Sequence, residues 1–164
     1  MALLQTAFRD LIRGRFLGHP IHAMLVHFPS ALFPVSLALD VIGLVSSDSS
    51  FASAAFYTLA AGLAGGAAAA LFGAIDYFKI PSSHPAWLKA TFHGGLNVIW
   101  LFSFAALFGA RLKGYPEARI ASAGAIIVTA ILVIGVVVSN FLGGELVFRH
   151  GIGAIETDTA KAAQ

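Results

Sequence analysis

Long runs of apolar residues, separated by short polar segments, dominate the chain. Four such runs occupy residues 21–45, 52–78, 86–110 and 120–142. Each is close to or above the roughly 20 residues that an α-helix needs to cross the hydrocarbon core of a bilayer. The pattern therefore predicts an all-α fold, in which residues 19–151 form an integral membrane four-helix bundle.

Proline and glycine residues divide these runs. Pro20 suits the first turn of the first helix, whereas Pro29 and Pro34 lie inside that helix and are expected to kink it. Gly62 and Gly66 form a GxxxG pair in the second run. Small residues at this spacing let a neighbouring backbone approach closely in lipid. We therefore expect the second helix to be central in the bundle.

The two ends of the chain differ from the apolar runs. Residues 1–18 place apolar side chains at helical spacing with arginines on the other side, which predicts an N-terminal interfacial amphipathic helix. Gly143 and Gly144 are expected to break the fourth helix, and the segment after them is too short and polar to cross the membrane again. Residues 152–164 are predicted to form a polar C-terminal tail. No internal repeat is evident.

Composition supports a membrane protein. Of the 164 residues, 58% are hydrophobic and only 11% are charged, and the mean hydropathy is +0.84, a balance that does not suit a soluble domain of this size. The absence of cysteine excludes disulfides, thiolate metal sites, ligation of iron–sulfur clusters and cysteine nucleophiles. No sequence signature of nucleic-acid binding is present.

The basic residues divide unevenly between the two faces of the expected bundle. One face holds both termini and the loop between the second and third helices. The basic residues on that face are Arg9, Arg13, Arg15, Lys79, Lys89, Arg149 and Lys161. The opposite face holds Arg111, Lys113 and Arg119. Because positive residues stay on the cytoplasmic side, we expect a multi-pass protein of the inner (cytoplasmic) membrane with both termini in the cytoplasm.

The six histidines gather at the face that carries both termini. They are His19, His22, His27, His84, His93 and His150. His93 is the strongest candidate for function, because it lies about two turns inside an apolar helix, where an unpartnered imidazole is costly. A structural interpretation is also open, in which Asn140 or Glu145 hydrogen-bonds to His93. His19 and His84 each precede a proline, and solvation or capping would also explain them.

Other polar residues of the apolar runs are expected near the same face. They are Asp76, Asn97, Asn140 and Glu145. They could orient metal-bound imidazoles from a second layer, although Asp76 could equally pair with Lys79. Asp40 lies near the opposite end of the first helix, where a hydrogen bond to a neighbouring helix would explain it.

Four segments resemble the domain-of-unknown-function 2231 membrane proteins. They are GHPIHAMLVHFP at residues 18–29, GAIDY at 73–77, HGGLN at 93–97 and GGELVFRHG at 143–151. The resemblance covers about residues 15–154 and implies that His19, His22, His93 and His150 belong to the recurring signature. One departure is Ala23, where proline is common in the family. Some members of this family look as if they are joined to Rieske-type iron–sulfur domains, so the resemblance implies a redox setting for the fold.

Three functional hypotheses remain open at this point. The first is a haem b protein for electron transfer, with His22 and His93 as candidate axial ligands of the iron and Arg15 or Arg149 near the propionates. The second is a site for zinc, copper or non-haem iron made by the four family-matched histidines with Asp76 or Glu145. The third is a cofactor-free structural subunit of a larger membrane complex.

The partners and the chemistry follow from these hypotheses. Lipid is the expected surrounding, and membrane or redox proteins are the expected partners, because a chain without cysteine must pass electrons to a separate protein. No nucleophile–base pair and no phosphate-binding loop is recognisable. We therefore expect an electron carrier or a complex subunit rather than an enzyme.

Overall fold

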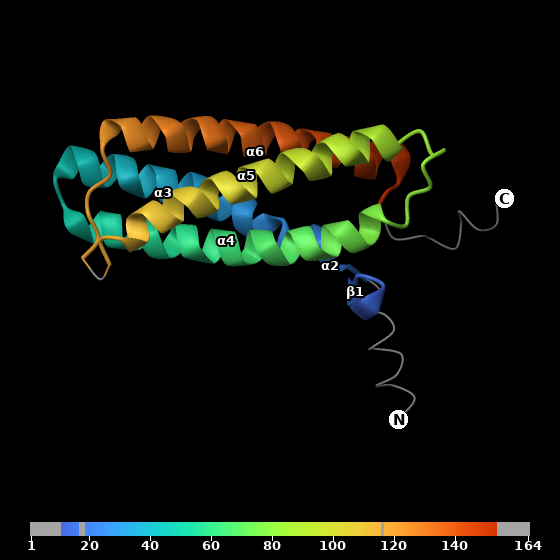
Figure 1. Cartoon of the computed structure of the whole chain (residues 1–164), viewed down its shortest axis with the longest axis horizontal. Helices are drawn as coiled ribbons and strands as arrows, with labels where there is room; N and C mark the ends of the chain where they lie inside the picture. Colours follow the sequence, from blue (N-terminus) through green and yellow to red (C-terminus); the bar gives the residue numbers. More distant parts are fainter. Residues whose placement is uncertain (1–10, 17–18, 116, 154–164) are drawn as a thin grey trace, which may run out of the picture.

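Four long helices lie side by side in the computed structural model, which describes residues 11–16, 19–115 and 117–153 (Figure 1). The described elements are β1 (Arg15–Phe16), β2 (His19–Pro20), α2 (Ile21–Leu25), α3 (His27–Ser46), α4 (Ser49–Tyr77), α5 (Trp87–Leu112) and α6 (Ala123–His150). Because α2 and α3 together form one span, the described residues contain four helical spans that are long and apolar enough to cross a membrane. The predicted all-α membrane bundle is confirmed.

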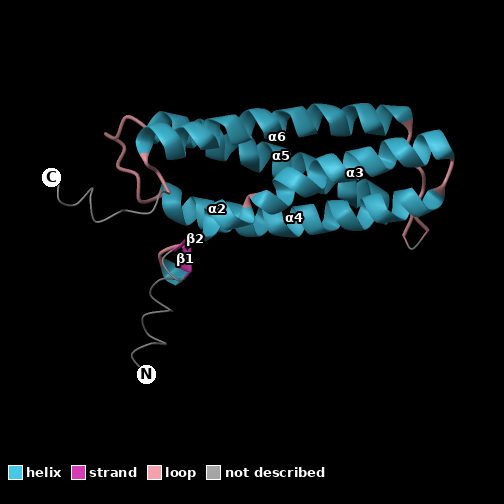
Figure 2. Ribbon diagram, turned by 180° about the vertical axis from the view of Figure 1, so that it is seen from behind, coloured by secondary structure: helices cyan, strands magenta, loops and turns pink. Residues whose placement is uncertain are grey.

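The four spans form a ring in which each packs against two neighbours. Helix α4 lies between α3 and α5, and α6 closes the ring against α5 and α3 (Figures 1 and 2). The loops α3–α4 and α5–α6 are therefore at one end of the bundle. We call this the far end, and we call the opposite end, where α4 ends and α5 begins, the near end.

The break between α2 and α3 lies one turn before Pro29. Helix α2 ends at Leu25, and Val26 separates it from α3. A proline ring clashes with the carbonyl group four residues earlier, which is that of Leu25 here, so Pro29 explains the break. Pro34, by contrast, lies inside α3, and the helix continues through it.

The predicted amphipathic helix is wrong at residues 13–16, and residues 1–10 and 17–18 of that prediction lie outside the described residues. Gly14 adopts φ +71°, and its N–H donates to the Leu11 carbonyl oxygen at 3.0 Å, which ends the helical turn. Arg15–Phe16 then pairs antiparallel with His19–Pro20. A strand thus takes the place of the predicted helix at Arg15–Phe16.

The predicted break of the fourth helix at Gly143 and Gly144 is also wrong. Helix α6 continues through both glycines to His150 and ends at Gly151, which adopts the left-handed conformation at φ 65°. Helical hydrogen bonds within lipid have no competition from water, so glycine is tolerated inside a membrane helix. The segment predicted to lie beyond the fourth helix is therefore its last two turns.

The interior of the ring is narrow and aromatic at its centre. Phe33 of α3 stacks on Phe104 of α5, with ring centroids 3.8 Å apart, and Leu59, Leu132 and Val136 complete this buried cluster. Most other large apolar side chains point outward. This inside-out balance is expected when lipid is the solvent.

Glycines bring α4 close to its neighbours. A Cβ built on Gly62 would lie 2.8 Å from the Phe33 ring, and one built on Gly66 would lie 3.0 Å from a Leu101 methyl carbon. The GxxxG pair therefore serves close packing, as the sequence indicates. In line with the expectation of a central second helix, α4 packs against α2, α3 and α5, and its contact with α3 is the most extensive in the bundle.

Side chains at the far end cap the helices that begin there. The Asp48 carboxylate accepts a hydrogen bond from the Ser50 backbone N–H at 2.8 Å, and this bond lowers the pKa of that carboxyl group. Ser122 caps α6 in the same way by accepting from the Ala125 N–H. The spans that return to the near end thus have defined starting points.

Candidate functional site

His22 of α2 lies against α4 near the near end of the bundle. Its Nδ1 donates to the carbonyl oxygen of Ala69 at 2.8 Å. One turn later on α4, Gly73 leaves room for the ring, because a Cβ at this position would lie 2.9 Å from the imidazole Cε1 and Nδ1. The contact therefore combines a hydrogen bond with a glycine four residues after the acceptor.

His93 of α5 lies against α6 in the same manner. Its Nδ1 donates to the carbonyl oxygen of Ser139 at 2.9 Å. Gly143, again four residues after the acceptor, leaves room for the ring, and a Cβ there would lie 2.8 Å from Cε1. The glycine that was expected to break α6 instead admits the imidazole of His93.

These hydrogen bonds determine which ring nitrogen carries the lone pair. A carbonyl oxygen only accepts, so Nδ1 of His22 and of His93 must carry the proton. In the neutral ring, Nε2 is then the unprotonated nitrogen that can bind a metal. The Asn97 amide nitrogen lies 3.2 Å from Nε2 and 3.3 Å from Nδ1 of His93, and it is 3.0 Å from the His93 carbonyl oxygen.

The other candidate histidines lie in different surroundings. Nδ1 of His27 is 3.2 Å from the Met24 carbonyl oxygen in its own turn of chain. The His150 ring packs edge-on against His84, with centroids 6.4 Å apart, and His19 is exposed in β2. No group of three or more histidine, aspartate or glutamate side chains able to hold a metal ion occurs in the described part of the chain. The four family-matched histidines are thus not assembled into one such group.

The carboxylates at the near end are occupied by basic side chains. Asp76 accepts from Lys79 at 2.7 Å, and the same ammonium group donates to the Arg13 carbonyl oxygen. Glu145 accepts from Lys89 of α5 at 2.6 Å and from Arg149 at 3.2 Å. These ion pairs join neighbouring segments at the membrane surface.

Most of the expected second layer of support does not contact His22 or His93. Asn140 donates to the Ser30 hydroxyl at 3.0 Å, whereas Asn97 contacts His93. The expectation that Asn140 or Glu145 hydrogen-bonds to His93 is wrong, because the Ser139 carbonyl takes that place. The sequence does not reveal that the backbone carbonyl groups of Ala69 and Ser139 accept hydrogen bonds from the two histidines.

At the far end, Asp40 forms a bidentate ion pair across the ring. Its carboxylate, 1% exposed, accepts from both terminal nitrogens of Arg111 of α5, at 3.1 Å and 2.5 Å. The sequence predicts a hydrogen bond between Asp40 and a neighbouring helix, but it does not identify Arg111 as the partner, since Arg111 enters there only as one of the charges that set the orientation in the membrane. The need of a buried carboxylate for a cation is the signal that could have identified it.

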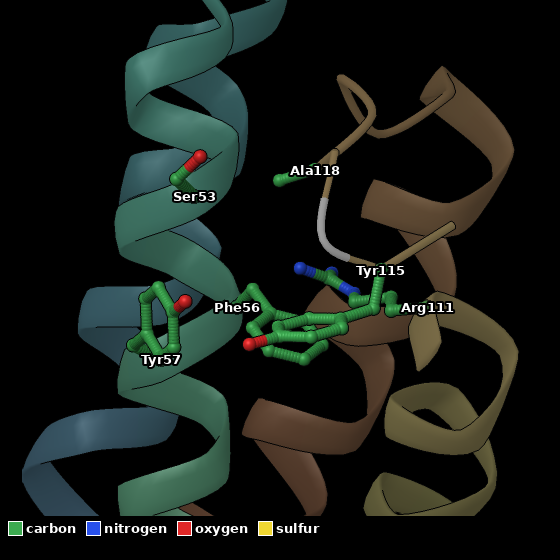
Figure 3. Close-up of a pocket in the computed structure, with 6 residues that line it drawn as sticks. All are labelled: Ser53, Phe56, Tyr57, Arg111, Tyr115 and Ala118. Atoms are coloured by element: carbon green, nitrogen blue, oxygen red, sulfur yellow. The ribbon is translucent and has the colours of Figure 1, made fainter. Parts of the chain in front are cut away.

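A small cavity lies beside this ion pair. Its lining residues are Ser53, Phe56, Tyr57, Arg111, Tyr115 and Ala118, between α4 and the loop that follows α5 (Figure 3). The volume of about 30 Å³ is enough for about one water molecule. The cavity reaches the Arg111 side chain and is far too small for a cofactor.

One buried polar atom inside the bundle has no partner among the described residues. It is the indole Nε1 of Trp100, two turns deeper than His93 on the same helix. The Trp100 ring packs on Gly135 of α6. A buried donor without an acceptor costs about 1–3 kcal/mol, so it is an observation that asks for an explanation.

Comparison with known proteins supports the resemblance. A family model described as "Predicted membrane protein (DUF2231)" matches residues 18–156. No curated protein and no solved structure matches the chain. The four family segments meet in pairs in the structure, since His22 contacts Gly73 and His93 contacts Gly143.

Proposed function

The chain belongs to the DUF2231 family of predicted membrane proteins, and on this basis we propose that it binds haem b and transfers electrons at one face of the membrane. His22 and His93 would be the axial ligands. The observation that carries the proposal is their common state: each ring donates from Nδ1 to a carbonyl oxygen of the neighbouring helix, which leaves Nε2 for the iron.

The number of available ligands favours haem over a bare metal ion. A zinc or copper site needs three or four protein ligands, whereas the porphyrin supplies four of the six ligands of haem iron and the protein needs to add two. His22 and His93 come from different helices, as is usual for cofactor sites in helix bundles. Their Nδ1–carbonyl hydrogen bonds would fix the ring orientation and raise the basicity of Nε2.

Other residues of the chain would complete the site. Haem would supply a centre that accepts and releases one electron. The indole N–H of Trp100, which lacks an acceptor in the described residues, offers a hydrogen bond to a bound group. Arg15 and Arg149, both at the near end, are the cations proposed to meet the propionates.

The orientation is part of the proposal. The described near end carries five basic residues and the far end three, with the near-end set being Arg13, Arg15, Lys79, Lys89 and Arg149. Following the positive-inside rule, we place the near end and both termini in the cytoplasm, in the inner membrane. Since all six histidines are at or near this end, the chain would exchange electrons with a partner protein on the cytoplasmic side.

Absorption spectroscopy of the detergent-purified protein tests the proposal. We expect a Soret band that shifts on reduction with dithionite, with about one haem per chain. The variants His22→Ala and His93→Ala should each lose the spectrum of six-coordinate low-spin iron. His27→Ala is the matched control, because its ring hydrogen-bonds to the Met24 carbonyl oxygen of its own turn of chain, and it should keep the wild-type spectrum.

Metal analysis of the same sample separates the alternatives. Stoichiometric zinc, copper or iron without a Soret band would overturn the haem proposal in favour of a metal site. A sample without colour or metal, before and after incubation with haemin, would overturn it in favour of a structural subunit.

A further inference from the structure

Three positions of α2 and α3 have counterparts at the same spacing in α5. Phe33 follows His22 by 11 residues and Asp40 follows Phe33 by 7, while His93, Phe104 and Arg111 have the same two intervals. Eleven residues are about three helical turns and eighteen are five. Each set therefore forms a stripe along one face of its span, and the two stripes are offset by 71 residues throughout.

Two residues of one stripe contact their counterparts in the other. Phe33 stacks on Phe104, and Asp40 pairs with Arg111. His22 and His93 are the third corresponding pair, and each ring donates to a carbonyl oxygen of the second helix of its own hairpin. When corresponding residues of two equivalent units face each other, the units are related by a two-fold axis that runs between them.

The second helix of each pair follows the same rule with an offset of 70 residues. The residues of α4 buried toward the interior include Leu59, Gly62, Gly66 and Ala69. Those of α6 include Thr129, Leu132, Val136 and Ser139, which are the four positions 70 residues later. Ala69 and Ser139 supply the carbonyls that hold the two histidines, and the glycines beside the rings, Gly73 and Gly143, are also 70 residues apart.

We infer that the chain is an internal repeat of two equivalent helical hairpins, α2–α4 and α5–α6, related by a pseudo-two-fold axis along the bundle. His22 and His93 are corresponding residues of this repeat and form one two-sided ligand site, in which Gly73 and Gly143 are positioning residues. The repeat stands on the contacts alone, whereas the ligand role of the pair rests on the proposed function. No internal repeat is evident from the sequence alone, because burial and contacts repeat at positions where most residue identities do not.

The two glycines determine where the imidazoles lie. A methyl group at Gly73 would come within 2.9 Å of the His22 ring, and one at Gly143 within 2.8 Å of the His93 ring. The ring is the mobile partner in each contact, so it would move away and lose its hydrogen bond to the carbonyl oxygen. Gly94, next to His93 in sequence, has nothing within 4 Å of an added Cβ and is the matched control.

The test is ¹⁵N NMR of the histidine rings in haem-free, detergent-solubilised protein, which reports the nitrogen that carries the proton. Single His→Gln variants assign the signals. In the wild type, His22 and His93 should both be protonated at Nδ1, and different states for the two rings would overturn the equivalence. This measurement stands even if a glycine variant does not fold.

The glycine variants test the positioning role. Gly73→Ala should change the signal of His22 alone, Gly143→Ala that of His93 alone, and Gly94→Ala neither. Unchanged signals in the two folded variants, judged by circular dichroism and gel filtration, would overturn it.

Haemin titration of the same variants tests the ligand role. Gly73→Ala and Gly143→Ala should each bind haemin about 10- to 100-fold more weakly than the wild type, as is typical when the support of a metal ligand is lost, while Gly94→Ala should match it. A wild type that binds no haemin but shows two Nδ1-protonated rings would overturn the proposed function and the ligand role, and would support the repeat. Equal haemin affinity in all variants would overturn the positioning role.

Discussion

The Asp40–Arg111 pair is a bidentate ion pair between side chains of α3 and α5. The carboxylate is almost fully buried and the guanidinium group is 20% exposed. Removing a charge from such a pair leaves its partner uncompensated in a medium that solvates it poorly. Replacing one of the two residues should therefore destabilise the fold strongly, whereas replacing both with apolar residues should destabilise it much less.

Asp40→Asn should therefore destabilise the protein by about 3 kcal/mol, because it leaves the charge of Arg111 without its counterion. The measurement is the free energy of unfolding of the purified protein in mixed micelles titrated with sodium dodecyl sulfate. The double variant Asp40→Leu/Arg111→Leu should be closer to the wild type than Asp40→Asn is. A double variant as unstable as the sum of the two single changes would contradict the pairing.

Individual residues also show where sequence analysis reaches its limit. Asp40 was recognised as needing a partner, and His93 as a costly residue inside an apolar helix. Their actual partners, the Arg111 side chain and the Ser139 carbonyl, depend on how two distant helices are rotated against each other. Apolar runs fix the length of a membrane helix but contain little information about its rotation.

Among the helices, α3 and α4 make the most extensive packing in the bundle. Gly62 is at the centre of this contact, directly under the stacked ring of Phe33. The interface depends on the absence of a side chain at this position, since van der Waals packing drives association between helices in lipid.

Gly62→Ala should cost about 1–3 kcal/mol, the usual range for overpacking, because the new methyl group must displace the Phe33 ring. Thermal unfolding followed by circular dichroism would show a lower midpoint for this variant. Gly109→Ala, where an added Cβ meets nothing within 4 Å, is the control and should unfold like the wild type. Equal midpoints for both variants would argue against the close α3–α4 contact.

The bounds of the elements were predictable where hydropathy alone decides them. All four spans were identified, and the errors concern glycines. Gly143 was interpreted as a helix breaker, whereas α6 continues through it and His93 fills the space beside it. A glycine that ends a helix and one that admits a side chain from a neighbour look the same in one sequence. Gly14 and Gly151, by contrast, adopt the left-handed conformation in turns that end a helix.

For the whole molecule, the chain offers a direct test of orientation because it contains no cysteine. Single cysteines can replace Ser82 in the near-end loop and Glu117 in the far-end loop, both of which are exposed. In intact spheroplasts, a membrane-impermeant maleimide should label Glu117→Cys but not Ser82→Cys, and lysis should make both reactive. The opposite pattern would reverse the proposed topology.

The pseudo-two-fold repeat was beyond prediction for a physical reason. The two hairpins share the positions of buried and contacting residues but few residue identities, as with Leu59 and Thr129 or Gly62 and Leu132. Many different apolar side chains can fill the same position in a bundle surrounded by lipid. The relation between the two hairpins is therefore visible in their packing and not in their residue identities. The family resemblance, by contrast, was carried by short motifs and is confirmed over residues 18–156.

The ion pair at the far end also has a consequence for assembly. Two copies of the first hairpin, packed as the two halves of one chain are packed, would place Asp40 against Asp40, and two copies of the second would place Arg111 against Arg111. Both like-charge arrangements are strongly unfavourable where water is scarce. During synthesis the first hairpin is completed before the second. Repulsion between Asp40 carboxylates then disfavours pairing with the first hairpin of another molecule, so this hairpin stays unpaired until Arg111 of the same chain is made.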